Sequence, residues 1–203
     1  MRPICVLNSG GFDSTLLLHQ LKEIYSDTMI YSLFFDYGQP NLEQEKECSF
    51  KNAIKLQCVP HKIKISPITW TTNNFYRGAD QDNTKDNYLE MRNLIFLSYA
   101  LSLCESIGAD KIFAAFMKPP PLNSGYNDAS VEFVKRFNDL AINTAGVHFY
   151  APLMEYEKFD LISWVSHHKI TPQDFHTCNI PIDGKRCGVC PDCEELKKIF
   201  KNY

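Results

Sequence analysis

Residues 4–18 read ICVLNSGGFDSTLLL: a short apolar run, a turn that holds two glycines, and the start of an amphipathic segment. The apolar run suits a buried strand, and Leu17, Leu21 and Ile24 then recur at helical spacing. A strand, a glycine-rich turn and a helix in this order bring free backbone N–H groups and the positive end of a helix dipole to one point. The stretch therefore predicts a strand–loop–helix unit with an anion site in its loop.

The alternation of apolar and amphipathic segments continues along the chain. Further strands are predicted at residues 29–35, 62–65 and 111–116, and a short edge segment at residues 148–153. Helices are predicted at residues 42–56, 92–108, 128–143 and 158–168. Strands that alternate with helices are typical of a parallel sheet covered by helices on both faces, so the predicted fold class is α/β and Rossmann-like.

Three details concern the ends of these elements. Helix 92–108 is strongly apolar, so we expect it to be largely buried and closed by Gly108. Asp128 stands at the start of the following helix and is a candidate N-cap. Residues 71–87 follow neither period and hold many turn formers, which predicts a mobile loop suited to act as a lid.

Composition limits the class of protein. The 203 residues are 44% hydrophobic and 22% charged, which suits a globular domain with a continuous core. We expect residues 1–170 to form this domain and residues 171–203 to form a small metal-bound appendage. Neither a membrane span nor a secretory signal is recognisable, so we expect a cytoplasmic protein. The net charge of −3 favours a small-molecule substrate over nucleic acid.

The glycine-rich turn has the composition of a phosphate-binding loop. Gly10 and Gly11 allow the backbone to approach phosphate oxygens. Hydroxyl donors stand at Ser9, Ser14 and Thr15. An acid beside phosphates, here Asp13, suits either a Mg²⁺ ligand or a helix cap. Neither GxxxxGK[ST] nor GxGxxG is present, which excludes a Walker A loop and a dinucleotide fingerprint.

Four of the eight cysteines are crowded near the C-terminus in the spacing C-x8-C-x2-C-x2-C. They are Cys178, Cys187, Cys190 and Cys193. Four thiolates at this spacing predict a closed, tetrahedral and structural Zn²⁺ site. An iron–sulfur cluster is the main alternative. The other cysteines, Cys5, Cys48, Cys58 and Cys104, read as reduced thiols in apolar or helical patterns.

The segment SGGFDS resembles the SGGxDS pyrophosphate loop of the N-type ATP pyrophosphatases, which have an adenine nucleotide alpha hydrolase-like fold. Together with FFDYGQ, RNLIFLSYALSLCESIGAD, NSGYND and CGVCPDC, it resembles the 7-cyano-7-deazaguanine synthase family of queuosine biosynthesis, nearly from residue 4 to residue 200. The resemblance implies an ATP-dependent carbon–nitrogen ligase that uses ATP, Mg²⁺ and Zn²⁺. Such an enzyme adenylates 7-carboxy-7-deazaguanine, forms the amide with ammonia and then the nitrile, and releases AMP and pyrophosphate. The family resemblance also implies a homodimer.

The resemblance also implies roles for individual residues. In the loop, the residues expected to bind ATP are Leu7, Ser9, Gly10, Gly11, Phe12, Asp13, Ser14 and Thr15. At the end of the second strand, the residues expected to bind ATP are Phe35, Gly38 and Gln39. Phe34 either stacks on the base or lies in the core. Asp13, Ser14 and Arg92 are the expected catalytic residues, unless Arg92 forms only a surface salt bridge. Substrate contacts are expected from Arg92, Asn93, Tyr126 and Asp128, and also from Lys118 because it follows the fourth strand at its carboxyl edge.

The chain departs from the family pattern near the expected substrate site. Residues 89–91 read LEM where a proline is usual, and residues 126–133 read YNDASVEF in place of YPDCRPEF, which puts Ser130 at the place of an arginine. These changes leave open an enzyme that stops at the amide or joins the activated acid to another amine. Two further alternatives are a tRNA thiolation enzyme and a module that senses nucleotide without catalysis.

Overall fold

The computed structural model describes residues 1–66, 89, 91–118, 127–178, 181–182 and 184–200. The loop predicted at residues 71–87 and the expected substrate residue Tyr126 lie outside the described residues.

The centre of the fold is a five-stranded sheet in which every strand pair is parallel, in the order β3-β2-β1-β4-β5. The strands are β1 (Ile4–Leu7), β2 (Ile30–Asp36), β3 (Val59–Lys64), β4 (Lys111–Phe113) and β5 (His148–Tyr150). The predicted α/β fold with a parallel sheet is confirmed. β3 begins three residues before its predicted start, and β4 ends three residues early. The order reverses direction beside β1, which is where open sheets of this kind bind ligands.

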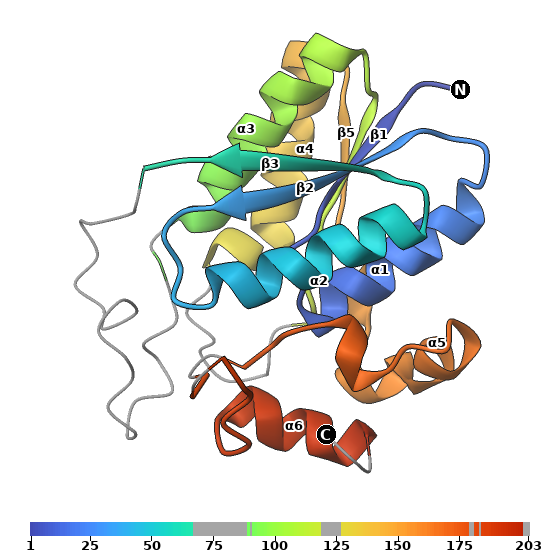
Figure 1. The fold of residues 1–203 in the computed structure, drawn as a ribbon. Coiled ribbons are helices and arrows are strands. Elements are labelled where there is room, and N and C mark those ends of the chain that lie inside the picture. The colour runs from blue at the N-terminus through green and yellow to red at the C-terminus, as the bar shows by residue number, and fades with distance from the viewer. Residues whose placement is uncertain (67–88, 90, 119–126, 179–180, 183, 201–203) are drawn as a thin grey trace.

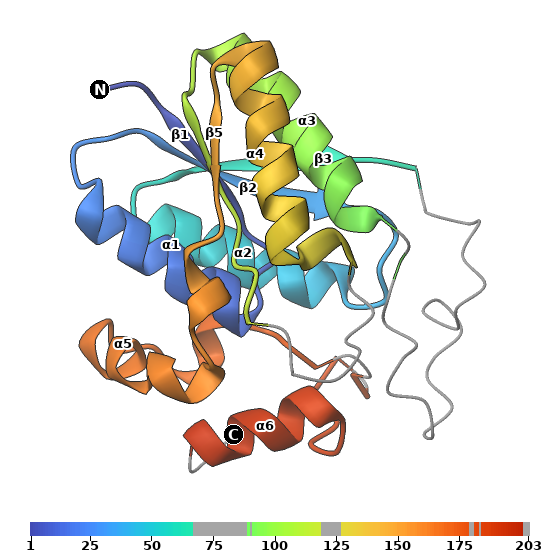
Figure 2. The same cartoon turned by 180° about the vertical axis from the view of Figure 1, so that it is seen from behind.

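Helices cover both faces of the sheet. They are α1 (Phe12–Ile24), α2 (Leu42–Lys55), α3 (Arg92–Ile107), α4 (Val131–Ala145), α5 (Ile162–His167) and α6 (Pro191–Ile199), with short 3-10 turns η2 (Asn127–Ala129), η3 (Pro152–Glu155), η4 (Lys158–Leu161) and η5 (Pro172–Asp174). α1 and α2 lie on one face, α3 and α4 lie on the other, and α5 and α6 lie together below α1 and α2 (Figures 1 and 2). Among the described helices, none is long and apolar enough to cross a membrane.

Two hydrophobic cores lie on opposite faces of the sheet because side chains alternate along each strand. Ile4 and Val6 of β1 pack in the first core with α1, and Cys5 packs in the second with α3 and α4. Phe175 and Leu196 from the C-terminal region also belong to the first core. The C-terminal region is therefore packed directly against α1, the helix that begins in the predicted phosphate-binding segment SGGFDS (residues 9–14, below called the phosphate loop).

Some details of the helices differ from the sequence-based expectations. α3 buries only Leu97, Ala100 and Cys104, so the expectation that it is largely buried is wrong. It covers one face of the sheet and leaves its other side to solvent, while Gly108 closes it as predicted, at φ +71°. Ile24, the last residue of α1, is 61% exposed and does not join the core.

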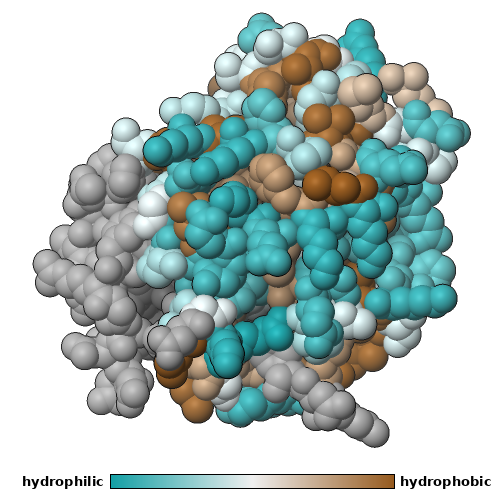
Figure 3. Space-filling model, viewed as in Figure 1, coloured by the Kyte–Doolittle hydropathy of each residue, from teal (hydrophilic) through white to brown (hydrophobic). Residues whose placement is uncertain are grey.

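The outer face over α1 and α2 is mostly hydrophilic, with scattered hydrophobic residues (Figure 3). The exposed side of α2 explains this, because the helix buries only Ser49, Asn52 and Ala53. The cavity described below therefore lies elsewhere, among the loops and helix ends at the carboxyl edge of the sheet.

Candidate active site

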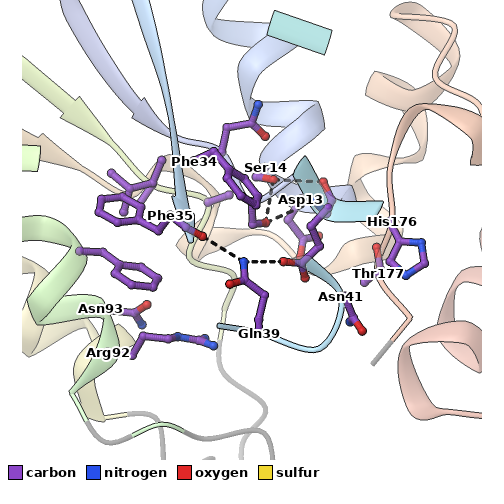
Figure 4. Close-up of a pocket in the computed structure, with 18 of the residues that line it drawn as sticks. Asp13, Ser14, Phe34, Phe35, Gln39, Asn41, Arg92, Asn93, His176 and Thr177 are labelled. Atoms are coloured by element: carbon purple, nitrogen blue, oxygen red, sulfur yellow. Dashed lines mark hydrogen bonds between the residues drawn. The ribbon is translucent and has the colours of Figure 1, made fainter. Parts of the chain in front are cut away.

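A cavity of about 480 Å³ opens at the carboxyl ends of β1, β2 and β4. This volume is typical of a site for a small molecule or nucleotide. Figure 4 shows side chains from five parts of the chain around it: α1, β2, the loop after β2, α3 and the segment before the cysteine cluster. Arg92 and Asn93 lie on one side, His176 and Thr177 lie on the other, and Gln39 lies between them (Figure 4).

Most of the residues expected from the sequence meet in this cavity. Those that line it are Leu7, Ser9, Gly11, Phe12, Asp13, Ser14, Phe34, Phe35, Gln39, Arg92 and Asn93. Thr15 is fully buried within α1, and Lys118 is exposed, with its ammonium 3.6 Å from Glu157. Neither of these two is among the lining residues. Their expected contacts with ligand stay predictions.

The phosphate loop is held by its own hydroxyls. The Ser14 hydroxyl donates to the carbonyl of Gly11 over 3.1 Å and lies 3.1 Å from the Ser9 hydroxyl, which accepts from the Gly11 N–H. Gly10 adopts φ +78°, and a Cβ at this position would lie 2.1 Å from the carbonyl oxygen of Glu45. Gly10 is therefore required for the loop to pack against α2, in addition to any approach of phosphate.

The segment before the cysteine cluster closes the loop from the other side. The Thr177 hydroxyl accepts from the N–H of Phe12 over 3.2 Å, and the N–H of His176 donates to the carbonyl of Gly10 over 2.8 Å. Asn41 donates to the carbonyl of Cys178 over 2.6 Å. His176 and Thr177 line the cavity, but no local pattern predicts them, because Thr177 lies 165 residues from its partner Phe12.

Asp13 presents an unpaired carboxyl oxygen at this end of the cavity. Within the described part of the chain, its buried Oδ1 has no hydrogen-bond partner. Burial raises the pKa of Asp13 to about 6, with Lys158 opposing the shift and Glu195 and Asp192 adding to it. Gly11 is the N-cap residue of α1 and has no side chain to cap it, and the cap at the first helical N–H comes from Thr177 rather than from Asp13. The free oxygen therefore fits a hard cation such as Mg²⁺ better than it fits a helix cap.

The end of β2 forms an aromatic and amide wall. Phe34 is fully buried and Phe35 stacks on Phe96, with ring centroids 4.3 Å apart. The Gln39 amide donates to the carbonyl of Phe35 over 2.9 Å, and the N–H of Tyr37 donates to Gln39 Oε1 over 3.0 Å. Gly38, at φ +81°, permits the turn between them.

Arg92 and Glu45 place opposite charges in the same cavity. The Arg92 guanidinium lies 5.6 Å from the ring centroid of Tyr37 and 5.9 Å from that of Phe96, and donates to the Tyr37 hydroxyl over 3.2 Å. Its buried Nε has no hydrogen-bond partner among the described residues. Arg92 is thus an enclosed cation rather than part of a surface salt bridge. Burial raises the pKa of Glu45 to about 7, against the opposing effects of Gln39 and Arg92. The sequence analysis missed Glu45.

Asp128 has a different role from the expected cap. Its Oδ2 accepts from the N–H of Asn93 over 2.8 Å, so it caps α3, whereas Ser130 caps α4 by accepting from the N–H of Phe133. The prediction that Asp128 caps its own helix is wrong, because η2 turns the chain back towards the start of α3. Asp128 is 1% exposed and positions Asn93, which lines the cavity.

The four clustered cysteines converge on one point. All four sulfur atoms lie within 4.8 Å of one another, and those of Cys187 and Cys193 are 4.0 Å apart. A tetrahedral Zn²⁺ site with Zn–S bonds near 2.3 Å requires sulfurs about 3.8 Å apart, so the group fits such an ion. Burial acts to raise the pKa of Cys187, but hydrogen bonds, first those from the N–H groups of Val189 and Cys190, lower it to about 7. The cluster therefore suits a metal.

Comparison with known proteins agrees with this arrangement. The family model described as "Queuosine biosynthesis protein QueC" matches residues 3–203. A 7-cyano-7-deazaguanine synthase from Acetivibrio thermocellus is 33% identical over 99% of this chain and 94% of its own, and one from Leptospira interrogans is 30% identical over 97% and 85%.

Two solved structures share the fold. The U34-tRNA thiolase NcsA from Methanococcus maripaludis, with its [4Fe-4S] cluster, has a TM-score of 0.60 at 12% identity and covers 99% of this chain and 65% of its own. The NMN synthetase from Francisella tularensis has a TM-score of 0.54 at 12% identity and covers 95% and 71%. At this identity the likeness concerns the fold alone.

Proposed function

Because the chain belongs to the family of the queuosine biosynthesis protein QueC, we propose that it is an ATP-dependent carbon–nitrogen ligase acting on 7-carboxy-7-deazaguanine. The enzyme adenylates the carboxylate, captures the adenylate with ammonia as the amide, and activates the amide oxygen again to leave 7-cyano-7-deazaguanine. AMP and pyrophosphate are released. Its relatives carry the name 7-cyano-7-deazaguanine synthase.

One observation carries the proposal: the SGGFDS loop and the enclosed guanidinium of Arg92 face the same cavity. A carboxylate is a poor electrophile, and its oxygen leaves only after it is bonded to a phosphoryl group. An enzyme for this step needs an anion site for the ATP phosphates and a cation for the acid, within one enclosed space. The N-terminus of α1 and Arg92 supply these two groups.

The remaining residues have supporting roles in this proposal. Asp13 would hold Mg²⁺, which supplies charge neutralisation on the phosphates when bound. Gln39 and the backbone after Phe35 would read the adenine edge. Asn93, positioned by Asp128, would contact the acid. The four clustered cysteines would hold Zn²⁺, which supplies a structural crosslink.

The alternative of tRNA thiolation is disfavoured by the lining of the cavity. The thiolation hypothesis requires a catalytic cysteine near the ATP site, but no cysteine is found among the described lining residues. Ser130, which replaces the family's arginine, caps α4 and is also absent from them. Among the described lining residues, Arg92 is the one Lys or Arg side chain available to the acid.

Mass spectrometry of the products tests the proposal directly. The zinc-loaded protein is incubated with Mg-ATP, 7-carboxy-7-deazaguanine and ammonium, and pyrophosphate is measured in parallel. We expect nitrile, AMP and pyrophosphate from the wild type and from Asp27→Asn, an exposed change beyond the far end of α1, and none from Asp13→Asn. Amide as the final product would identify an enzyme that stops halfway. ATP binding without cleavage would contradict the proposal and favour a sensor.

A further inference from the structure

Glu45 lies where the two ends of the cavity meet. Its backbone carbonyl packs against Gly10 of the phosphate loop, so closely that glycine is required there. Its side chain lines the cavity, and its Oε2 accepts from the Gln39 amide over 3.1 Å. Glu45 thus stands between the loop that would hold the phosphates and Arg92, which would hold the acid.

Apart from its hydrogen bond with Gln39, the side chain of Glu45 has no polar partner among the described residues. Within the described residues it forms no ion pair, although Arg92 acts on it electrostatically. Burial raises its pKa to about 7, so both the acid and the carboxylate form are accessible near neutral pH. A buried acid without a counter-ion costs folding free energy and is characteristic of functional sites.

The amine step of the reaction requires a proton acceptor. When ammonia attacks the acyl adenylate, a C–N bond forms and the C–O bond to the phosphate breaks, with the electron pair leaving on AMP. The product amide has one N–H fewer than the attacking ammonia, so one proton must go to a base. A carboxylate beside the acyl carbon takes this proton most effectively when its pKa is near the working pH.

We propose that the carboxylate of Glu45 is the general base that removes this proton from the attacking ammonia, an assignment that rests on the proposed function. The other acids among the described lining residues are less suited. Asp13 lies in the phosphate loop as the candidate Mg²⁺ ligand, and Asp192 lies 3.9 Å from the ammonium of Lys158. Asp128 is not among the lining residues and is fixed by the cap of α3.

The test separates the amine step from adenylation. Hydroxylamine is largely unprotonated at pH 7 and traps acyl adenylates as hydroxamates with little need for a base. In Glu45→Gln we expect amide formation to fall about 100-fold or more. Hydroxamate formation and the pyrophosphate released with it should stay near the wild-type rate. Glu43→Gln is the matched control, because Glu43 is an exposed residue on the same helix, paired with Lys46.

The pH profile distinguishes a base from a structural residue. Rates are expressed per concentration of free ammonia. The rate of the wild type should then fall as the pH drops below about 7, because Glu45 becomes protonated. The rate of Glu45→Gln should not show this acid limb of the pH profile. Glu45→Asp, which keeps a shorter carboxylate, should recover part of the rate and the limb.

Two results would overturn the assignment. One is equal amide formation by the wild type and Glu45→Gln with the same pH profile. The other is a folded Glu45→Gln that loses hydroxamate as well as amide, since Glu45 would then act in adenylation. If the wild type itself releases no pyrophosphate with the acid, the proposed function fails instead.

Discussion

The phosphate loop and the cysteine cluster are both short loops that end at the start of a helix, yet one is open and the other is closed. The phosphate loop, which runs into the first turn of α1, is braced by its own hydroxyls and leaves a buried oxygen of Asp13 without a partner in the described structure. In the cluster, which includes Cys193 in the first turn of α6, four sulfurs face one another and backbone N–H groups point at Cys178 and Cys187.

The difference shows how a reactive site keeps some of its polar groups free for a ligand. In a closed metal site all the donor atoms coordinate one ion, and this coordination stabilises the fold. An open site must hold its shape without its ligand, so the loop's own hydroxyls are supplemented by contacts from another segment. Here Thr177 and His176, directly before Cys178, supply hydrogen bonds to the phosphate loop. The closed site thus supports the open one.

The largest effect is expected from Gly10→Ala. The new Cβ would lie 2.1 Å from the Glu45 carbonyl at a positive φ, so the loop and α2 must separate. We expect the free energy of unfolding, measured by urea denaturation, to fall by about 3 kcal/mol or more. Gly146→Ala is the control, because φ is also positive there but nothing lies within 4 Å. It should cost about 1 kcal/mol, and equal losses would refute the steric explanation.

Asp13→Asn should separate stability from function. The pKa of Asp13 is raised from 3.8 to about 6 in the folded protein, so folding favours its protonated form. The favourable contribution is complete below pH 4 and is lost as the pH rises through 6. At pH 7, in Mg²⁺-free buffer, we expect the variant to be more stable than the wild type by about 1–3 kcal/mol.

The advantage of Asp13→Asn should shrink as the pH falls from 6 to 4, while pyrophosphate release is lost at every pH. Thermal unfolding at each pH, with a parallel pyrophosphate assay, checks both. An advantage that grows towards low pH would show that the carboxylate is stabilised, rather than penalised, in the folded loop.

A smaller effect is expected from Thr177→Val, which removes the acceptor for the Phe12 N–H but keeps the shape of the side chain. Loss of this cap should cost about 1 kcal/mol of unfolding free energy and weaken ATP binding, measured by calorimetry. Thr144→Val is the control, because Thr144 is exposed and its hydroxyl donates to the Leu140 carbonyl within α4. If both variants bind ATP like the wild type, the C-terminal segment does not brace the loop.

The sequence was sufficient for the features encoded in contiguous residues. The apolar run, the two glycines and the helical spacing of leucines within one stretch predict β1, the turn at Gly10 and α1. The spacing of the four cysteines predicts that they converge. The family followed from motifs spread over the chain and is confirmed by the comparisons. The homodimer, the division at residue 170 and the identity of the metal stay predictions.

The features that were missed depend on contacts between distant segments. Nothing local marks Thr177 as a partner of Phe12, or Glu45 as part of the cavity, because α2 reads as an ordinary amphipathic helix. The sequence predicts that Asp128 caps the helix that follows it, because the capping pattern involves only neighbouring residues. Its actual partner, Asn93, is 35 residues away.

The most direct test of the coupling between the two loops is ATP binding during stepwise metal removal. Zinc is withdrawn from the folded protein with a chelator while zinc content and ATP affinity are measured on the same samples, and zinc is then restored. We expect ATP affinity to fall in step with zinc content and to recover with it, because the segment that holds Phe12 and Gly10 is released. A zinc-free protein that stays folded and binds ATP with unchanged affinity would contradict the account.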